Sequence, residues 1–117
     1  MNGKIPHIVQ YQGSKRVLAP QILQYMPERF NRLIEPFSGM AAISIATAYE
    51  NRTNSFLVND LNKPLVDMLQ EAIEKPEQLI MNYSKVWEEQ FSYGENHIQH
   101  FYDVRERFNN GEKTSAN

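Results

Sequence analysis

The chain contains no cysteine, which excludes disulfide bonds and thiolate metal sites. Its three histidines, His7, His97 and His100, are scattered along the sequence, so we predict no metal site. No stretch approaches the roughly 18 to 20 consecutive apolar residues that a membrane span requires, and the N-terminus lacks the apolar core of a signal peptide. These absences predict a cytoplasmic protein without a membrane partner.

A strong positive charge is also missing. Twelve Lys and Arg residues stand against fourteen Asp and Glu residues, which gives a formal net charge of −2 at pH 7. Domains that bind nucleic acid through its phosphates are normally strongly basic. Any contact with nucleic acid must therefore be local, or must lie outside these 117 residues.

The hydrophobic share of 41% and the charged share of 22% are those of an ordinary globular chain. A length of 117 residues is that of one small domain. Neither an internal repeat nor a long linker divides the sequence. We therefore predict a single domain over residues 1–117.

Hydrophobic periodicity predicts helices and strands in alternation. The expected elements are a helix over Ser14–Met26, a strand over Arg32–Glu35, a helix over Met40–Glu50, a strand over Ser55–Asn59, and helices near Pro64–Ile73, Pro76–Phe91 and Asn96–Asn109. Strands joined by crossover helices pair in parallel, so the predicted fold class is α/β. Two strands are few for a parallel sheet, so we expect part of a larger α/β domain, with an exposed sheet edge that favours self-association.

Aromatic residues recur at helical spacing in the last two expected helices. Tyr83 and Trp87 align in one helix, and Phe101 aligns with Phe108 in the other. Such a stripe is more often core packing than a binding surface. We interpret it as core.

The strongest local signal is Glu35-Pro36-Phe37-Ser38-Gly39-Met40-Ala41-Ala42. It combines a strand end, a glycine turn and the start of a helix, as nucleotide-type loops do. Gly39 permits a close backbone approach, and the small residues after it let the helix pack near the strand. With one glycine it is not a G-x-G-x-x-G motif, and by itself it could be an ordinary turn.

Two further segments add to this signal. Asp60 follows the second expected strand about 20 residues after Gly39, where a carboxylate can accept hydrogen bonds from a ribose diol; a turn or helix-capping role is the alternative. Tyr11-Gln12-Gly13-Ser14-Lys15 is a glycine turn between an aromatic residue and a cation. It lacks the Walker pattern, and alone it reads as a surface turn.

Taken together and in order, Tyr11–Lys15, Glu35–Gly39 and Asn59–Asn62 resemble the first three motifs of Dam-like N6-adenine-specific DNA methyltransferases. Phe101–Asn109 resembles the family's helix before the target-recognition region. The resemblance implies a partial Rossmann-like methyltransferase fold that stops before the later strands. It also implies S-adenosylmethionine as cofactor and double-stranded DNA as the partner of the full-length protein.

The resemblance implies a set of cofactor-binding residues: Tyr11, Lys15, Glu35, Phe37, Ser38, Gly39 and Asp60. Within this set, Lys15 would form a charge-assisted hydrogen bond with the methionine carboxylate, and Asp60 would accept hydrogen bonds from the ribose hydroxyls. The Phe37–Gly39 turn would line the methionine and sulfonium region, while Glu35 would help to order the loop.

Three departures from the family pattern stand out. Family members usually carry Trp or Phe where Tyr11 stands, and usually a second glycine near Ala41. The family's Asp-Pro-Pro-Tyr-type motif has no counterpart, since none of the six prolines is adjacent to another. We therefore assign no catalytic residue, expect this chain to be inactive alone, and expect the most basic, DNA-contacting part beyond Asn117.

Two other functions fit the same residues. A nicotinamide- or flavin-binding α/β domain would also use the glycine turn and Asp60, although the missing glycines argue against it. A non-catalytic remnant that serves only as an interaction or scaffold domain would keep these motifs without binding either ligand.

Overall fold

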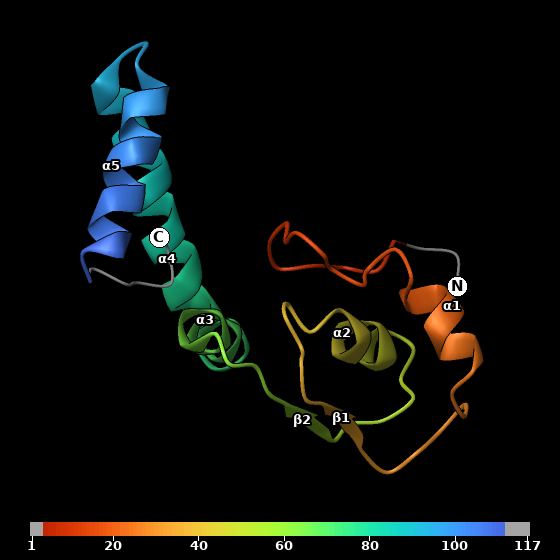
Figure 1. Cartoon of the computed structure of the whole chain (residues 1–117). Coiled ribbons are helices and arrows are strands. Elements are labelled where there is room, and N and C mark those ends of the chain that lie inside the picture. The colour runs from red at the N-terminus through yellow and green to blue at the C-terminus, as the bar shows by residue number, and fades with distance from the viewer. Residues whose placement is uncertain (1–3, 112–117) are drawn as a thin grey trace. The chain divides into compact units, whose positions relative to one another are not determined.

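The computed structural model describes residues 4–111, and its helices and strands alternate as the sequence predicts (Figure 1). The chain divides into two compact units, residues 1–65 and 66–117. Helix α3 (Lys63–Glu74) runs across the boundary between them. The division alone therefore does not separate two domains, and a single domain over residues 1–117 stays a prediction.

The first unit contains the sheet. Its elements are α1 (Ala19–Gln24), β1 (Leu33–Glu35), α2 (Ala42–Tyr49) and β2 (Phe56–Val58). The two strands pair in parallel, with Leu33 opposite Phe56, because α2 returns the chain to the starting end of the sheet. A two-stranded parallel sheet with helices confirms the predicted mixture of α and β structure.

Helix α1 is shorter than predicted. It begins at Ala19 rather than Ser14, so the predicted start is wrong, and Pro20 occupies its first turn. Proline has no backbone N–H and its ring collides with the preceding turn of a helix, so a helix cannot extend more than one turn before it. Residues 15–18, immediately before it, therefore form a turn.

The core of the first unit lies between α1 and α2. Ala19, Leu23 and Ala46 are almost fully buried there, together with Ile5 from the N-terminal segment. Alanine at the contact lets two helix axes approach closely. This small core fixes α2, and with it the loop between β1 and α2.

Arg52 ties the end of α1 to the segment after α2. Its Nη1 donates to the carbonyl oxygens of Leu23 at 2.6 Å and Met26 at 3.3 Å, and its Nε pairs with Glu50 at 2.6 Å. Helix C-terminal carbonyls lack partners within their own helix, and a cation there is favourable. Arg52 therefore serves as the C-terminal cap of α1.

Replacing Arg52 with methionine is expected to lower the free energy of unfolding by about 1.5 to 3 kcal/mol, because charge-assisted hydrogen bonds to partly buried carbonyls are lost. Chemical denaturation followed by circular dichroism measures this. Arg29→Met, at an exposed position, is the control and should change stability by less than about 0.5 kcal/mol. Equal losses in the two variants would refute the capping role.

The second unit is helical. Apart from most of α3, it consists of α4 (Pro76–Glu89), the 3-10 turn η1 (Gln90–Tyr93) and α5 (His97–Asn109). Figure 1 shows α4 and α5 side by side, joined through η1. The three predicted helices of this region are confirmed within one or two residues. Asn96 caps α5 by accepting a hydrogen bond from the backbone N–H of Gln99.

The aromatic stripe of this unit is not core, and that interpretation is wrong. Tyr83, Trp87 and Phe101 are each more than half exposed, whereas Val104 and Phe108 are half-buried. Helical spacing places side chains on one face, but it does not say that another element covers this face.

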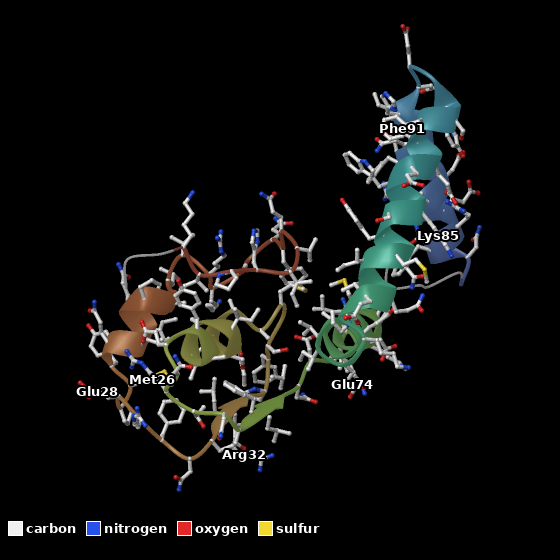
Figure 2. All side chains as sticks on the ribbon, turned by 180° about the vertical axis from the view of Figure 1, so that it is seen from behind. Met26, Glu28, Arg32, Glu74, Lys85 and Phe91 are labelled. Atoms are coloured by element: carbon white, nitrogen blue, oxygen red, sulfur yellow. The ribbon has the colours of Figure 1, made fainter. Side chains whose placement is uncertain are left out.

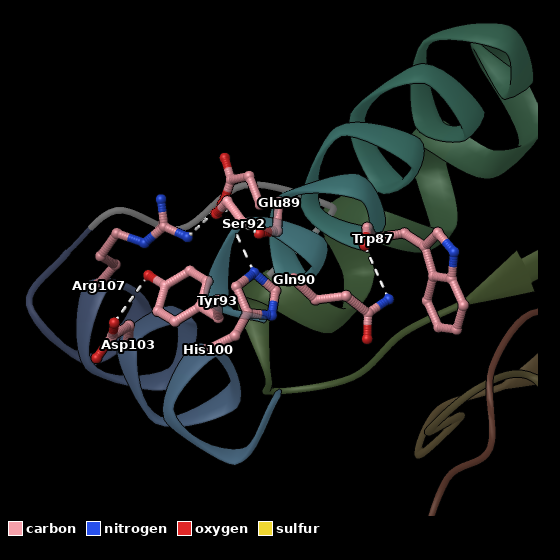
Figure 3. A network of polar contacts seen from close by, with 8 residues as sticks. All are labelled: Trp87, Glu89, Gln90, Ser92, Tyr93, His100, Asp103 and Arg107. Carbon is pink, nitrogen blue, oxygen red and sulfur yellow. Dashed lines mark hydrogen bonds and ion pairs between the residues drawn. The ribbon is translucent and has the colours of Figure 1, made fainter. Parts of the chain in front are cut away.

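A polar network joins η1 and the end of α4 to α5 (Figure 3). Asp103 accepts hydrogen bonds from Gln99 Nε2 at 2.7 Å and from Tyr93 Oη at 2.8 Å. Both bonds hold the pKa of Asp103 below its ordinary value of 3.8, and the bond from Gln99 has the larger effect. Arg107 Nη2 donates to Glu89 Oε2 at 3.0 Å and so links the two helices.

The lowered pKa of Asp103 predicts a dependence of stability on pH. Because this pKa is lower in the folded chain, the stabilisation is complete above 3.8 and is lost as the pH falls through the folded value. We expect Asp103→Asn to lower the thermal midpoint at pH 7, and the difference from wild type to shrink below about pH 4. A difference that stays constant down to about pH 2 would contradict this assignment. Glu95→Gln, at an exposed turn, is the control.

Within the described residues, no helix has the length and apolar character needed to cross a bilayer. The same part of the chain contains no group of three His, Asp or Glu side chains placed to hold a metal ion.

Candidate functional site

Glu35, at the end of β1, holds the first turn of α2. Its Oε2 accepts hydrogen bonds from the backbone N–H of Ser44 at 2.9 Å and from the Ser44 hydroxyl at 2.5 Å. The first N–H groups of a helix have no partner within it, so this carboxylate satisfies one of them. Glu35 thereby orders the loop between β1 and α2 by fixing the start of α2.

Gly39 lies directly beneath the ring of Tyr11. A Cβ atom at this position would come within 3.1 Å of Tyr11 Cε1, and its φ of +51° is in the left-handed region. Both the space and the backbone therefore require glycine. We expected another group to approach the backbone closely at Gly39. That group is the ring of Tyr11, which belongs to the motif Tyr11–Lys15 in the N-terminal segment.

Ala41 adopts the left-handed conformation as well, with φ 54° and ψ 38°, immediately before α2. This conformation costs an L-residue roughly 1 to 2 kcal/mol. Ala41 is buried, so its methyl packing offsets part of that cost. The position is close to the one where the family usually places its second glycine.

Asp60 connects the two strand ends. Its Oδ2 accepts the backbone N–H of Gly39 and its Oδ1 accepts that of Asn62, both at 2.9 Å. The hydrogen bond from Asn62 has the largest effect and that from Gly39 the next largest, and both lower the pKa of Asp60 below 3.8. The side chain therefore stays a carboxylate at neutral pH. Asn59 adds a bond from its Nδ2 to the carbonyl oxygen of Pro36 at 3.0 Å.

A hollow of about 220 Å³ opens at the ends of the two strands, entirely within the first unit. Six of the seven predicted site residues line it: Tyr11, Lys15, Phe37, Ser38, Gly39 and Asp60. The seventh, Glu35, is not among its lining residues. Four residues that we did not predict also line it: Gly13, Ser14, Met40 and Ala42. All four lie inside the quoted motifs, so treating each motif as a continuous segment would have found them.

The lining residues differ in exposure. Phe37 is 91% exposed, whereas Ser38 is buried and its hydroxyl donates to the carbonyl oxygen of Gly39 at 3.2 Å. Ser38 therefore shapes the turn, while Phe37 offers a free aromatic face. Within residues 4–111 the ammonium of Lys15 pairs with no carboxylate, which leaves it available to an anion.

A strand, a glycine turn, a crossover helix and a second strand that ends in a carboxylate form the arrangement of α/β domains that bind nucleotide-type ligands. Comparison with known families identifies the class. The model of the D12 class N6 adenine-specific DNA methyltransferases matches residues 11–117, and the chain belongs to this family. The resemblance seen in the sequence is confirmed.

Two curated relatives agree with this assignment. The chain is 35% identical over 71 residues to the Type II methyltransferase M1.LlaDCHI of Lactococcus lactis subsp. cremoris, which covers 61% of the chain and 24% of that relative. It is 28% identical over 102 residues to the Retron Ec67 DNA adenine methylase of Escherichia coli, which covers 87% and 32%. The matches thus span 24% and 32% of the length of these relatives. No solved structure matches the chain.

Proposed function

We propose that this chain binds S-adenosylmethionine in the hollow at the ends of β1 and β2, as the cofactor-binding part of a DNA adenine N6-methyltransferase. The observation that supports it most is the convergence of Tyr11, Gly39 and Asp60 from three separate segments on one hollow. The cofactor supplies an electrophilic methyl group, and the residues of this chain bind and orient it.

The chemistry of the lining residues fits this cofactor. A carboxylate has about four acceptor positions, and Asp60 uses two of them for backbone N–H groups, so two remain for a ribose diol. The Lys15 ammonium would meet the methionine carboxylate by a charge-assisted hydrogen bond. The rings of Tyr11 and Phe37 line the hollow and offer apolar surface to the ligand.

The rest of the proposal concerns the whole protein. β1 and β2 would be two strands of a larger Rossmann-like sheet; Ile34 and Leu57 are exposed on these strands, as expected if further elements cover them. The whole protein would act on double-stranded DNA in the cytoplasm, in a restriction-modification setting like that suggested by its Type II relative. It would flip the target adenine out of the duplex before transfer.

We propose that the 117-residue chain does not transfer methyl groups by itself, because it has no Asp-Pro-Pro-Tyr-type run. Incubation with radiolabelled cofactor and adenine-containing DNA tests this. Labelled DNA above the level of a heat-denatured control would overturn it.

Titration calorimetry with S-adenosylhomocysteine tests the cofactor part. The hollow of about 220 Å³ is smaller than the roughly 300 to 1,000 Å³ of typical ligand pockets. It encloses only part of the ligand, so we expect a Kd between roughly 10 μM and 1 mM. NADH in the same cell should give no heat of binding. Preference for NADH would favour a nicotinamide-binding domain, and binding of neither ligand by a folded chain would favour a non-catalytic remnant.

We also propose self-association through a sheet edge, because within residues 4–111 each strand of the sheet pairs on one side only. Light scattering at increasing protein concentration should show a rising mass. A monomer mass at every concentration would exclude it.

A further inference from the structure

Four large apolar side chains line one exposed face of α4 and η1: Ile80, Tyr83, Trp87 and Phe91, here called the aromatic ridge. All four are more than half exposed. The rings of Tyr83 and Trp87 are stacked with centroids 6.4 Å apart, and Phe91 meets Trp87 edge-on at 6.4 Å. Figure 2 labels Phe91, which lies in η1 just beyond the end of α4.

The aromatic ridge has the features of a docking surface. Contiguous exposed apolar side chains are uncommon on chains that have no partner, and aromatic residues are enriched at interface centres. A shallow hollow of about 260 Å³ lies against Tyr83, Ser84 and Trp87 and offers space for a partner's side chain. The ridge is built from residues of the second unit, whereas the candidate cofactor site is built from residues of the first.

The charge around the aromatic ridge is negative. Residues 66–117 contain five Lys and Arg against ten Asp and Glu, a net charge of −5, whereas residues 1–65 contain seven against four, a net charge of +3. Glu77 precedes Ile80 by three residues and Glu88 precedes Phe91 by three, so both acids lie beside the ridge. Lys85 is two residues from both Tyr83 and Trp87 and lies on the opposite face.

This charge selects among possible partners. Nucleic acid and anionic lipid would be repelled by the acidic unit. A second copy of the chain that docked through the same face would bring Glu77 and Glu88 against the same acids. A surface with apolar side chains flanked by Lys or Arg would gain from both the apolar contact and the charge.

We propose that the aromatic ridge docks a basic amphipathic helix of a partner protein. The helix lays its apolar side chains along Tyr83, Trp87 and Phe91, and its Lys or Arg side chains lie beside Glu77 and Glu88. This adds a protein-binding surface to a family defined by its action on DNA.

Trp87 is the only tryptophan of the chain, so its fluorescence reports directly on the aromatic ridge. The probe is a synthetic amphipathic Leu/Lys peptide of about four helical turns, matched in length to α4. The same peptide with Glu in place of Lys is its control. We expect a saturable blue shift of Trp87 with the Leu/Lys peptide and none with the Leu/Glu peptide.

Variants of the full chain locate the effect. Tyr83→Ser with Phe91→Ser keeps the reporter and should weaken binding at least about tenfold. Glu77→Gln with Glu88→Gln should remove the preference for the Lys peptide. Lys85→Gln, on the opposite face, is the matched control and should bind like wild type. Circular dichroism checks that every variant is folded.

Four results would overturn the proposal. These are no shift with the Leu/Lys peptide, equal binding of the two peptides, a blue shift that rises with protein concentration alone, and an equal shift with single-stranded oligonucleotide. The third would assign the ridge to a second copy, and the fourth to nucleic acid.

Discussion

Gly39→Val is expected to abolish binding of S-adenosylhomocysteine and to destabilise the chain more than any other single change in the loop. The left-handed φ of +51° costs an L-residue roughly 1 to 2 kcal/mol, and a β-branched side chain more. The new Cβ would also meet the Tyr11 ring at 3.1 Å. The ring and the turn must separate, so the hollow loses two of its walls. Calorimetry measures the binding, and thermal unfolding measures the stability.

Gly94→Ala separates the two effects. Gly94 has a similar φ of +60°, but no atom lies within 4 Å of its would-be Cβ. This variant should lower stability through its backbone conformation and leave the affinity for S-adenosylhomocysteine unchanged. If Gly39→Ala binds as tightly as wild type, Tyr11 does not need to lie against Gly39 for binding.

Asp60→Ala is expected to remove detectable binding as well. The change leaves the N–H groups of Gly39 and Asn62 without their acceptor and takes away the proposed partner of the ribose diol. Loss of an interaction of this kind weakens binding by roughly tenfold or more, which places an already weak Kd beyond calorimetry. Asp60→Asn should fail too, because the amide N–H₂ that replaces one carboxylate oxygen is a donor and cannot accept the backbone bond of that oxygen.

Asn59→Ala is the matched control for Asp60. It removes one neighbouring hydrogen bond, to the carbonyl oxygen of Pro36, and leaves the carboxylate in place. We expect its affinity to stay within about fivefold of wild type, since one ordinary hydrogen bond contributes about 1 kcal/mol. Equal loss in both variants would mean that loop order, rather than the carboxylate, decides binding.

Much of the candidate site could be read from the sequence. Six of the seven proposed residues line one hollow because each belongs to a short motif whose local conformation is strongly constrained. Gly39 is required by its own backbone angle, and Asp60 comes two residues after the end of β2. The carboxyl ends of parallel strands lie at one edge of a sheet, so these motifs meet once the pairing is parallel.

Other contacts could not be read in this way. Arg52 binds carbonyl groups 25 to 29 residues earlier in the chain, and no periodicity records such a pair. The family resemblance implied that Glu35 is a cofactor-binding residue that helps to order the loop, but it did not say through which contact. The carboxylate of Glu35 points to Ser44, nine residues later, because the first turn of α2 has N–H groups to satisfy.

By itself, the sequence determined the order of helices and strands, the parallel pairing, the family, and the glycine turn with its acidic partner, since these follow from local periodicity and from backbone angles that few residues tolerate. Only the tertiary structure decided that Tyr11 covers Gly39, that Glu35 caps α2, and that the aromatic ridge is exposed. Periodicity identifies which face of a helix is apolar, but what covers that face depends on contacts between residues far apart in the chain.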